Sequence, residues 1–138
     1  EEKYVEYLLT QAVESIKKQT SVAITVLKTG HSDTSLYDSR IKDTFFWGYI
    51  EGFIFAAFYD SGLPSLEFFE KYEKFALKKL FPSFGVSVME EVKALKDEIS
   101  VFEKGMDSGQ TDYDNWTETN QPKSLGQFLI TGEVISKN

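Results

Sequence analysis

Hydrophobic residues recur at helical spacing along much of the chain. Within residues 2–18 the apolar positions lie three or four residues apart, with charged side chains between them: Val5, Leu8, Leu9, Ala12 and Ile16. Residues 65–81 repeat this pattern, with glutamates near the beginning and lysines near the end, an order that complements the helix dipole. Both segments are therefore predicted to form amphipathic helices.

The most apolar segment is residues 44–59, which is dominated by aromatic side chains and carries one charged residue, Glu51. Gly62 and Pro64 follow it as a stop signal, because glycine suits the turn after a helix and proline cannot continue one. A membrane-spanning helix needs roughly 20 consecutive apolar residues, which this segment does not offer. The sequence predicts a buried core helix and no membrane span.

Small residues recur every four positions inside this central segment, at Gly48, Gly52 and Ala56. Such a stripe lets the backbone of a neighbouring helix approach closely. Because a glycine in a helix interior costs about 0.5–1 kcal/mol relative to alanine, two glycines indicate a packing role. A tight helix crossing is the favoured interpretation, and a ligand cleft is the alternative.

Two other segments allow more than one interpretation. Residues 20–27 are rich in β-branched side chains, which favours a strand; the alternative is a helix that continues from the first one. Residues 88–104 are predicted to form one helix with a narrow apolar seam, made of Val88, Val92, Leu95, Ile99 and Phe102. We expect this seam to pack within the bundle, and the alternative is a homodimer contact.

The remaining segments complete the predicted fold. Residues 30–37 and 106–121 are predicted to be polar loops, and the tail from 122 to 138 is predicted to dock as a short helix or an extended strand. The chain is therefore predicted to form a single globular domain over residues 1–138. Its fold class is mainly all-α, a small bundle of about five helices around the central aromatic helix, with a possible short strand at 20–27.

Charge and composition narrow the classes of function. The chain has a net charge of −7, and an acidic surface repels nucleic acid and attracts basic partners. The absence of cysteine excludes disulfides and thiolate catalysis, and the single histidine, His31, excludes sites that need two histidines. No metal site and no cofactor are expected. A cytoplasmic and an exported location both fit this composition.

The predicted loop at 106–121 combines acidic and aromatic residues and contains no basic residue. Tyrosine and tryptophan are favoured as binding hot spots, and carboxylates complement a basic surface. An EF-hand calcium loop is excluded because an aspartate occupies the position that requires glycine. The alternative to a binding site is a solvated linker. The candidate partner-binding residues are Asp107, Asp112, Tyr113, Asp114, Trp116 and Glu118.

Glu51 is the candidate for an enzymatic function. A buried carboxyl group without a partner can act as a general acid, and a glycosidase-like hydrolase would pair it with a second carboxylate. Asp43, Asp60 or an acid of the 106–121 loop could supply that carboxylate. The structural alternative is a Glu51 that reaches solvent or pairs with Arg40, Lys42 or a neighbouring lysine. An open cleft shared with a second acid would favour the hydrolase.

The sequence as a whole favours a non-catalytic protein-binding module. Residues 40–43, 47–50 and 97–101 resemble parts of helical amidase-immunity proteins of the type VI secretion system, although this chain lacks the cysteines that many of those proteins carry. That resemblance covers a limited part of the chain and implies binding to a partner enzyme. We therefore expect an acidic immunity or inhibitor protein that neutralises a basic protein partner, with the Glu51 hydrolase as the alternative.

Overall fold

The computed structural model describes residues 2–29, 43–62, 66–119, 125 and 128–129, and these residues form helices and no strand. The long α-helices are α1 (Glu2–Thr29), α3 (Thr44–Asp60) and α6 (Ile99–Thr119), and the shorter ones are α4 (Phe69–Leu80) and α5 (Gly85–Lys93). Two 3-10 turns, η1 (Leu66–Phe68) and η2 (Lys96–Glu98), precede α4 and α6. The predicted all-α fold is confirmed. The predicted loop at 30–37 lies outside the described residues.

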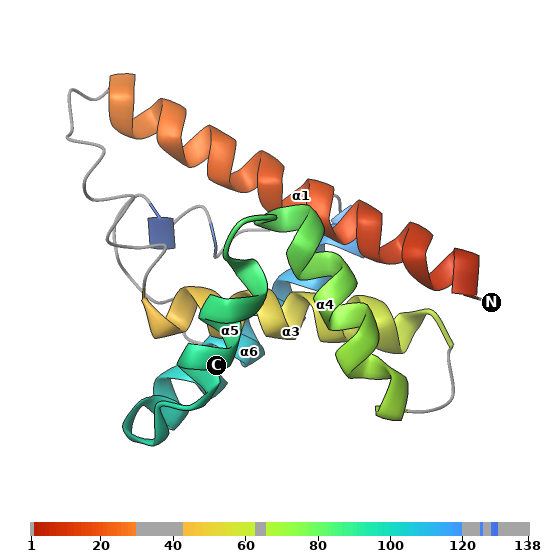
Figure 1. The fold of residues 1–138 in the computed structure, drawn as a ribbon. Coiled ribbons are helices and arrows are strands. Elements are labelled where there is room, and N and C mark those ends of the chain that lie inside the picture. Colours follow the sequence, from red (N-terminus) through yellow and green to blue (C-terminus); the bar gives the residue numbers. More distant parts are fainter. Residues whose placement is uncertain (1, 30–42, 63–65, 120–124, 126–127, 130–138) are drawn as a thin grey trace.

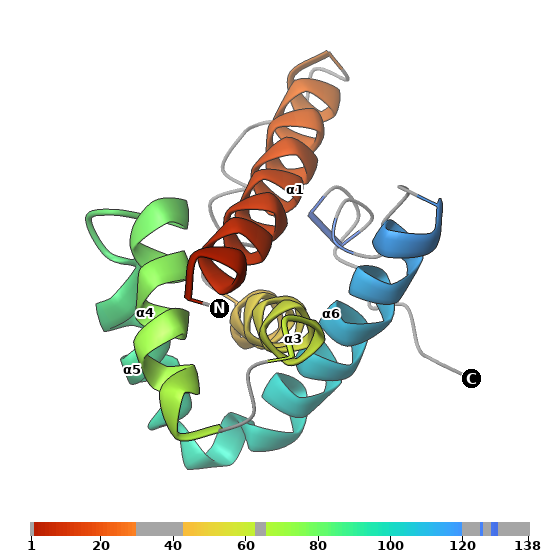
Figure 2. The same ribbon diagram turned by 90° about the vertical axis from the view of Figure 1, so that its right-hand side faces the viewer.

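The aromatic helix α3 occupies the centre of the structure, as the sequence predicts. Figure 2 views α3 nearly end-on, with α1, α4 and α6 arranged around it. The side chain of Asp43 caps its first turn by accepting a 2.8 Å hydrogen bond from the backbone N–H of Phe45. Gly62 follows the helix with a φ of +79°, a conformation that favours glycine. None of the described helices is long and apolar enough to cross a membrane.

The prediction of a strand at 20–27 is wrong, and its helical alternative is correct, because α1 continues through these residues to Thr29. The β-branched side chains favour a strand only where a partner strand can cover them. Here the helical period continues instead: Val13, Ile16 and Ala23 are all buried in the core. Packing of this face against α3 and α4 outweighs the local strand propensity, and Figure 1 shows α1 as one long helix.

The prediction of one helix at 88–104 is also wrong. Helix α5 ends at Lys93, the backbone turns at Leu95, and α6 begins only at Ile99. The seam of Val88, Val92, Leu95, Ile99 and Phe102 is therefore divided between two helices. Its members now differ in environment, since Val92 is buried, while Leu95 and Ile99 are 50% and 61% exposed. The turn lets α6 leave the direction of α5 and pack along α3 (Figure 2).

Helix α6 also corrects the predicted loop at 106–121, because it extends through that segment to Thr119. Glycines and polar residues gave this segment a weak helical propensity. The helix forms because one of its faces packs against α3, where Gly105, Ser108 and Gly109 are buried. Tertiary packing supplies most of the stability of such helices.

The crossing of α3 and α6 brings two backbones together through glycines on both helices. A Cβ added at Gly48 or Gly52 would overlap the backbone of Phe102 or Met106 respectively. A Cβ added at Gly105 or Gly109 would overlap the backbone of α3 around Phe45 or Tyr49. The paired residue numbers rise together, so the two helices run in the same sense along their contact.

The tail contributes to the same core through the few of its residues that are described. Leu125, Phe128 and Leu129 are buried, and the ring of Phe128 lies 4.8 Å from that of Phe45. These three residues belong to the tail that was predicted to dock on the bundle. The other apolar residues of the tail, which include Ile130, Val134 and Ile135, lie outside the described residues.

We predict that Gly52→Ala and Gly109→Ala each destabilise the protein by about 1–3 kcal/mol, because a methyl group forces the two backbones apart. This loss outweighs the gain in helix propensity that alanine normally brings. Chemical denaturation of each variant measures the free energy of unfolding. Glu103→Ala, at an exposed position of α6, is the control and should unfold like the parent protein. Equal stability of Gly52→Ala and the parent would contradict the crossing.

Candidate binding site

Helix formation at 106–119 separates the six predicted partner-binding residues onto different faces. The prediction that they lie on a polar loop is wrong, because all six belong to α6. Asp107, Asp114 and Glu118 are exposed, Trp116 is half-buried, and Asp112 and Tyr113 are buried. The structure therefore leaves three carboxylates on the surface of α6 and turns two of the candidates inward.

Asp112 belongs to a buried polar network. Its Oδ2 atom accepts hydrogen bonds from the Tyr49 hydroxyl at 2.7 Å and from the backbone N–H of Leu125 at 3.3 Å. Gln19 donates to the same tyrosine oxygen at 3.3 Å. Burial, and then the nearby Asp112 carboxylate, raise the pKa of Tyr49 well above its ordinary value. Asp112 thus connects α1, α3, α6 and the tail inside the protein.

Tyr113 and Trp116 pack against α3 in an aromatic cluster. The ring of Phe53 lies 5.5 Å from that of Tyr113 and 5.8 Å from that of Trp116. The Tyr113 hydroxyl donates a 2.8 Å hydrogen bond to Oδ2 of Asp60, the last residue of α3. Burial, followed by this hydrogen bond, raises the pKa of Tyr113 far above its ordinary value.

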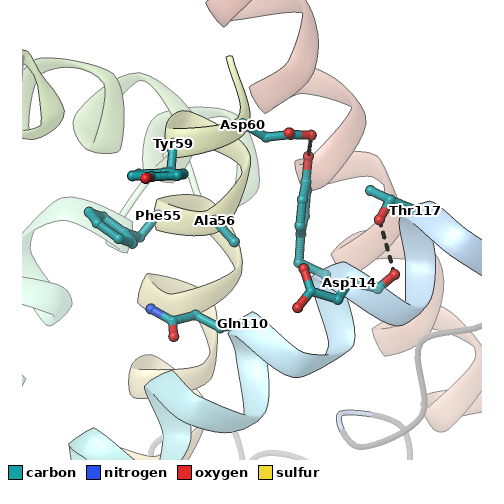
Figure 3. A pocket seen from close by; sticks show the side chains of 8 residues that line it. Phe55, Ala56, Tyr59, Asp60, Gln110, Asp114 and Thr117 are labelled. Carbon is teal, nitrogen blue, oxygen red and sulfur yellow. Dashed lines mark hydrogen bonds between the residues drawn. The ribbon is translucent and has the colours of Figure 1, made fainter. Parts of the chain in front are cut away.

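A pocket of about 360 Å³ opens beside this cluster, between the second half of α3 and α6. Its size falls within the range of small-ligand sites. Figure 3 shows the rings of Phe55 and Tyr59 on one side of Ala56, and the carboxylates of Asp60 and Asp114 on the other. The lining residues are Phe55, Ala56, Tyr59, Asp60, Gln110, Tyr113, Asp114 and Thr117. No basic residue is among them.

Sequence reasoning found part of this pocket and missed the rest. Tyr113 and Asp114 are among the predicted partner-binding residues, whereas Tyr59 and Gln110 are not. Asp60 was predicted only as a possible second carboxylate for Glu51. The signal that could have found them is the repeat of small residues in both helices. Aligning Gly48 and Gly52 with Gly105 and Gly109 places the end of α3 beside the residues that follow Gly109. Ala56, the third member of the predicted stripe, lines the pocket.

Glu51 lies in a second charged cluster, on another part of α3. It is buried, and its Oε1 atom lies 2.9 Å from Nζ of Lys93. The same ammonium donates hydrogen bonds of 2.8 and 3.0 Å to the two carboxylate oxygens of Glu73. Oε1 of Glu51 therefore has a close positive charge but no well-aligned donor. Glu51 is therefore ion-paired with Lys93, and not with either of the two residues named from the sequence, Arg40 and Lys42.

The cluster has the second carboxylate that a hydrolase would need, but in a different arrangement. Glu73 supplies this carboxylate, in place of Asp43, Asp60 or an acid of α6, and Lys93 bridges it to Glu51. Glu51, Glu73 and Lys93 line a cavity of about 360 Å³, and Glu51 and Lys93 also line a second cavity of about 320 Å³. Among the residues that the structure describes, no group of three or more acidic or histidine side chains could hold a metal ion.

We predict that Tyr113→Phe lowers the free energy of unfolding by about 1–2 kcal/mol at neutral pH, through loss of the hydrogen bond to Asp60. It should also weaken the dependence of stability on alkaline pH. Because the folded-state pKa of this phenol exceeds its unfolded value of about 10, its contribution is complete below that pH and is lost as the pH rises further. Denaturation at a series of pH values measures both effects. Tyr59→Phe, which alters an exposed phenol, is the control; equal alkaline profiles for the two variants would contradict this prediction.

We predict that Lys93→Met destabilises the protein by about 1–3 kcal/mol, because it leaves two buried carboxylates facing each other. Adding Glu51→Gln to Lys93→Met should recover part of the loss, since it removes one of the uncompensated charges. A double-mutant cycle by chemical denaturation measures this coupling. Strictly additive effects would show that the ion pair carries no stability.

Comparison of the chain with models of protein families, with curated proteins and with solved structures finds no match in any of the three.

Proposed function

We propose that this protein is a non-catalytic binding module of the immunity or inhibitor type, which neutralises a basic protein partner through the exposed acids of α6 and the adjoining pocket. The observation that carries this proposal is the lining of the pocket, where the carboxylates of Asp60 and Asp114 lie on one side of Ala56 and the rings of Phe55 and Tyr59 on the other, without any basic residue. Acids and aromatic rings together suit a cationic surface, because the first supply charge and the second supply contact area.

The exposed side of α6 extends this acidic surface beyond the pocket. Asp107, Asp114 and Glu118 are exposed, and residues 105–119 include no lysine or arginine. A surface with one sign of charge accelerates association with an oppositely charged partner and gives a binding rate that falls as the salt concentration rises. Half-buried Trp116 lies beside these acids, its ring 5.7 Å from that of Tyr113.

The Glu51 hydrolase is the weaker alternative. The ion pair of Glu51 with Lys93 supports the non-catalytic proposal. Glu51 also lines a cavity together with Glu73, and this shared cavity is the observation that keeps the hydrolase as the alternative. A homodimer through the divided seam is a further, weaker proposal. Leu95 and Ile99 are its exposed members, and they line a cavity with Val92 and Phe102.

The test is binding to the full chain by lysine- and arginine-rich peptides and by partners isolated from a lysate of the source. We expect binding that weakens steadily as salt rises. The combined variant Asp107→Asn, Asp114→Asn and Glu118→Gln should reduce affinity at least tenfold, because it removes the exposed acids of α6. It leaves the buried Asp112 intact, so the fold is retained.

The matched control combines Glu90→Gln, Glu91→Gln and Asp97→Asn, three exposed acids outside the site. It changes the net charge by the same amount and should bind like the parent protein, apart from a small general charge effect. Equal losses in both triple variants would place the binding elsewhere on the acidic surface. No binding to any basic peptide or protein at low salt would refute the proposed function.

A further inference from the structure

The charged groups of the pocket beside α3 and α6 are carboxylates, which only accept hydrogen bonds. The Tyr113 hydroxyl is already used as a donor to Oδ2 of Asp60, and the Thr117 hydroxyl donates to the backbone carbonyl of Asp114 at 3.0 Å. Within the described residues, Oδ1 of Asp60 and the carboxylate of Asp114 receive no hydrogen bond. Gln110 and the Tyr59 hydroxyl can each donate or accept. The two carboxylates are the charged groups of the pocket, so the occupant that satisfies them is positively charged and rich in donors.

The ends of both helices add negative potential to the same region. Because α3 and α6 run in the same sense, the pocket lies between the last turns of α3 and residues 110–117 of α6. The carbonyl end of a helix carries a partial negative charge that a basic side chain normally offsets. Neither the last turn of α3 nor that of α6 contains a basic residue, and Asp60 adds an acid at the end of α3. The lack of a basic residue at these helix ends leaves their negative potential uncompensated, which favours the binding of a cation.

The shape of the pocket indicates a long side chain with an apolar stem. One wall consists of the rings of Phe55 and Tyr59, whose centres are 6.4 Å apart, and Tyr59 is 73% exposed. The carboxylates stand on the opposite side of Ala56 (Figure 3). An occupant that spans the pocket must therefore place methylene groups or a flat π-system on the rings and its charge among the carboxylates.

We infer that this pocket receives the side chain of a single arginine from the basic partner, with its stem against Phe55 and Tyr59 and its guanidinium between Asp60 and Asp114. This inference rests on the proposed function and specifies what the partner presents to the site. A guanidinium offers five N–H donors and no acceptor, whereas an ammonium offers three donors from one point. Arginine therefore meets acceptors on several sides of the pocket better than lysine does.

The experiment is a titration of the isotopically labelled full chain with argininamide, followed by nuclear magnetic resonance shifts of the backbone amides. Lysinamide and citrullinamide serve as comparison probes, because the first has a positive charge without the planar fork and the second has the shape without the charge. We expect saturable shifts at residues 55–60 and 110–117 with argininamide. Lysinamide should bind about fivefold more weakly, and citrullinamide should not bind.

Variants identify the groups that hold the probe. Asp114→Asn should weaken argininamide binding about tenfold, while Glu91→Gln, which removes an exposed acid of α5, should leave it unchanged. Tyr59→Ala should weaken binding about threefold through loss of the ring, and Tyr59→Phe, which retains the ring, should restore it. Tyr59 and Asp114 are both exposed, so these substitutions act on the site and leave the core intact.

The outcomes separate this inference from the proposed function. If arginine-rich peptides bind but argininamide shifts no residue of the pocket, the arginine site is refuted and the proposed function stands. Equal affinity for argininamide and citrullinamide, or no effect of Asp114→Asn, also refutes the arginine site. If argininamide binds as expected but no basic peptide or protein does, the pocket is a cation site and the proposed function fails.

Discussion

Close contact between the backbones of α3 and α6 determines how the rest of the molecule is arranged. Glycines on both helices remove the side chains that would otherwise hold the two backbones apart, and a Cβ at any of the four would overlap the facing main chain. Helices at this separation make extensive van der Waals contacts with each other. The crossing also fixes the position of α6 along α3. That position brings Asp112 within hydrogen-bond distance of Tyr49, and Tyr113 within hydrogen-bond distance of Asp60.

The two charged sites differ in how the protein compensates their acids. At the Glu51 cluster, Lys93 approaches both carboxylates, so one positive charge within the fold offsets part of their negative charge. At the pocket, the acids meet only a phenol, a glutamine and aromatic rings. Both pocket acids are exposed, and no basic side chain of the lining pairs with them. The contrast between these sites is the physical basis for proposing that the pocket binds a partner and that the cluster stabilises the fold.

The sequence predicted elements that depend on local pattern and failed where packing decides. Residues 44–59 were predicted as a buried helix because the segment is strongly apolar but too short to span a membrane. The structure confirms this helix as α3. Residues 106–119 were assigned to a loop because glycines and acids weaken an isolated helix, yet contact with α3 makes them helical. The pocket was predicted only in part, since Asp60 and its partner Tyr113 lie 53 residues apart in the chain and meet only through the crossing of α3 and α6.

The same-sense alignment of α3 and α6 has a consequence for how the chain reaches its fold. Two helices that follow each other directly pack most easily in opposite directions, with a short turn between them. Parallel neighbours need a long return connection, which here consists of η1, α4, α5 and η2. Closing such a loop costs chain entropy before the crossing can form. The contact at the centre of the native structure is thus among the most non-local ones, and the rate of folding depends on how readily α4 and α5 guide the chain back to α3.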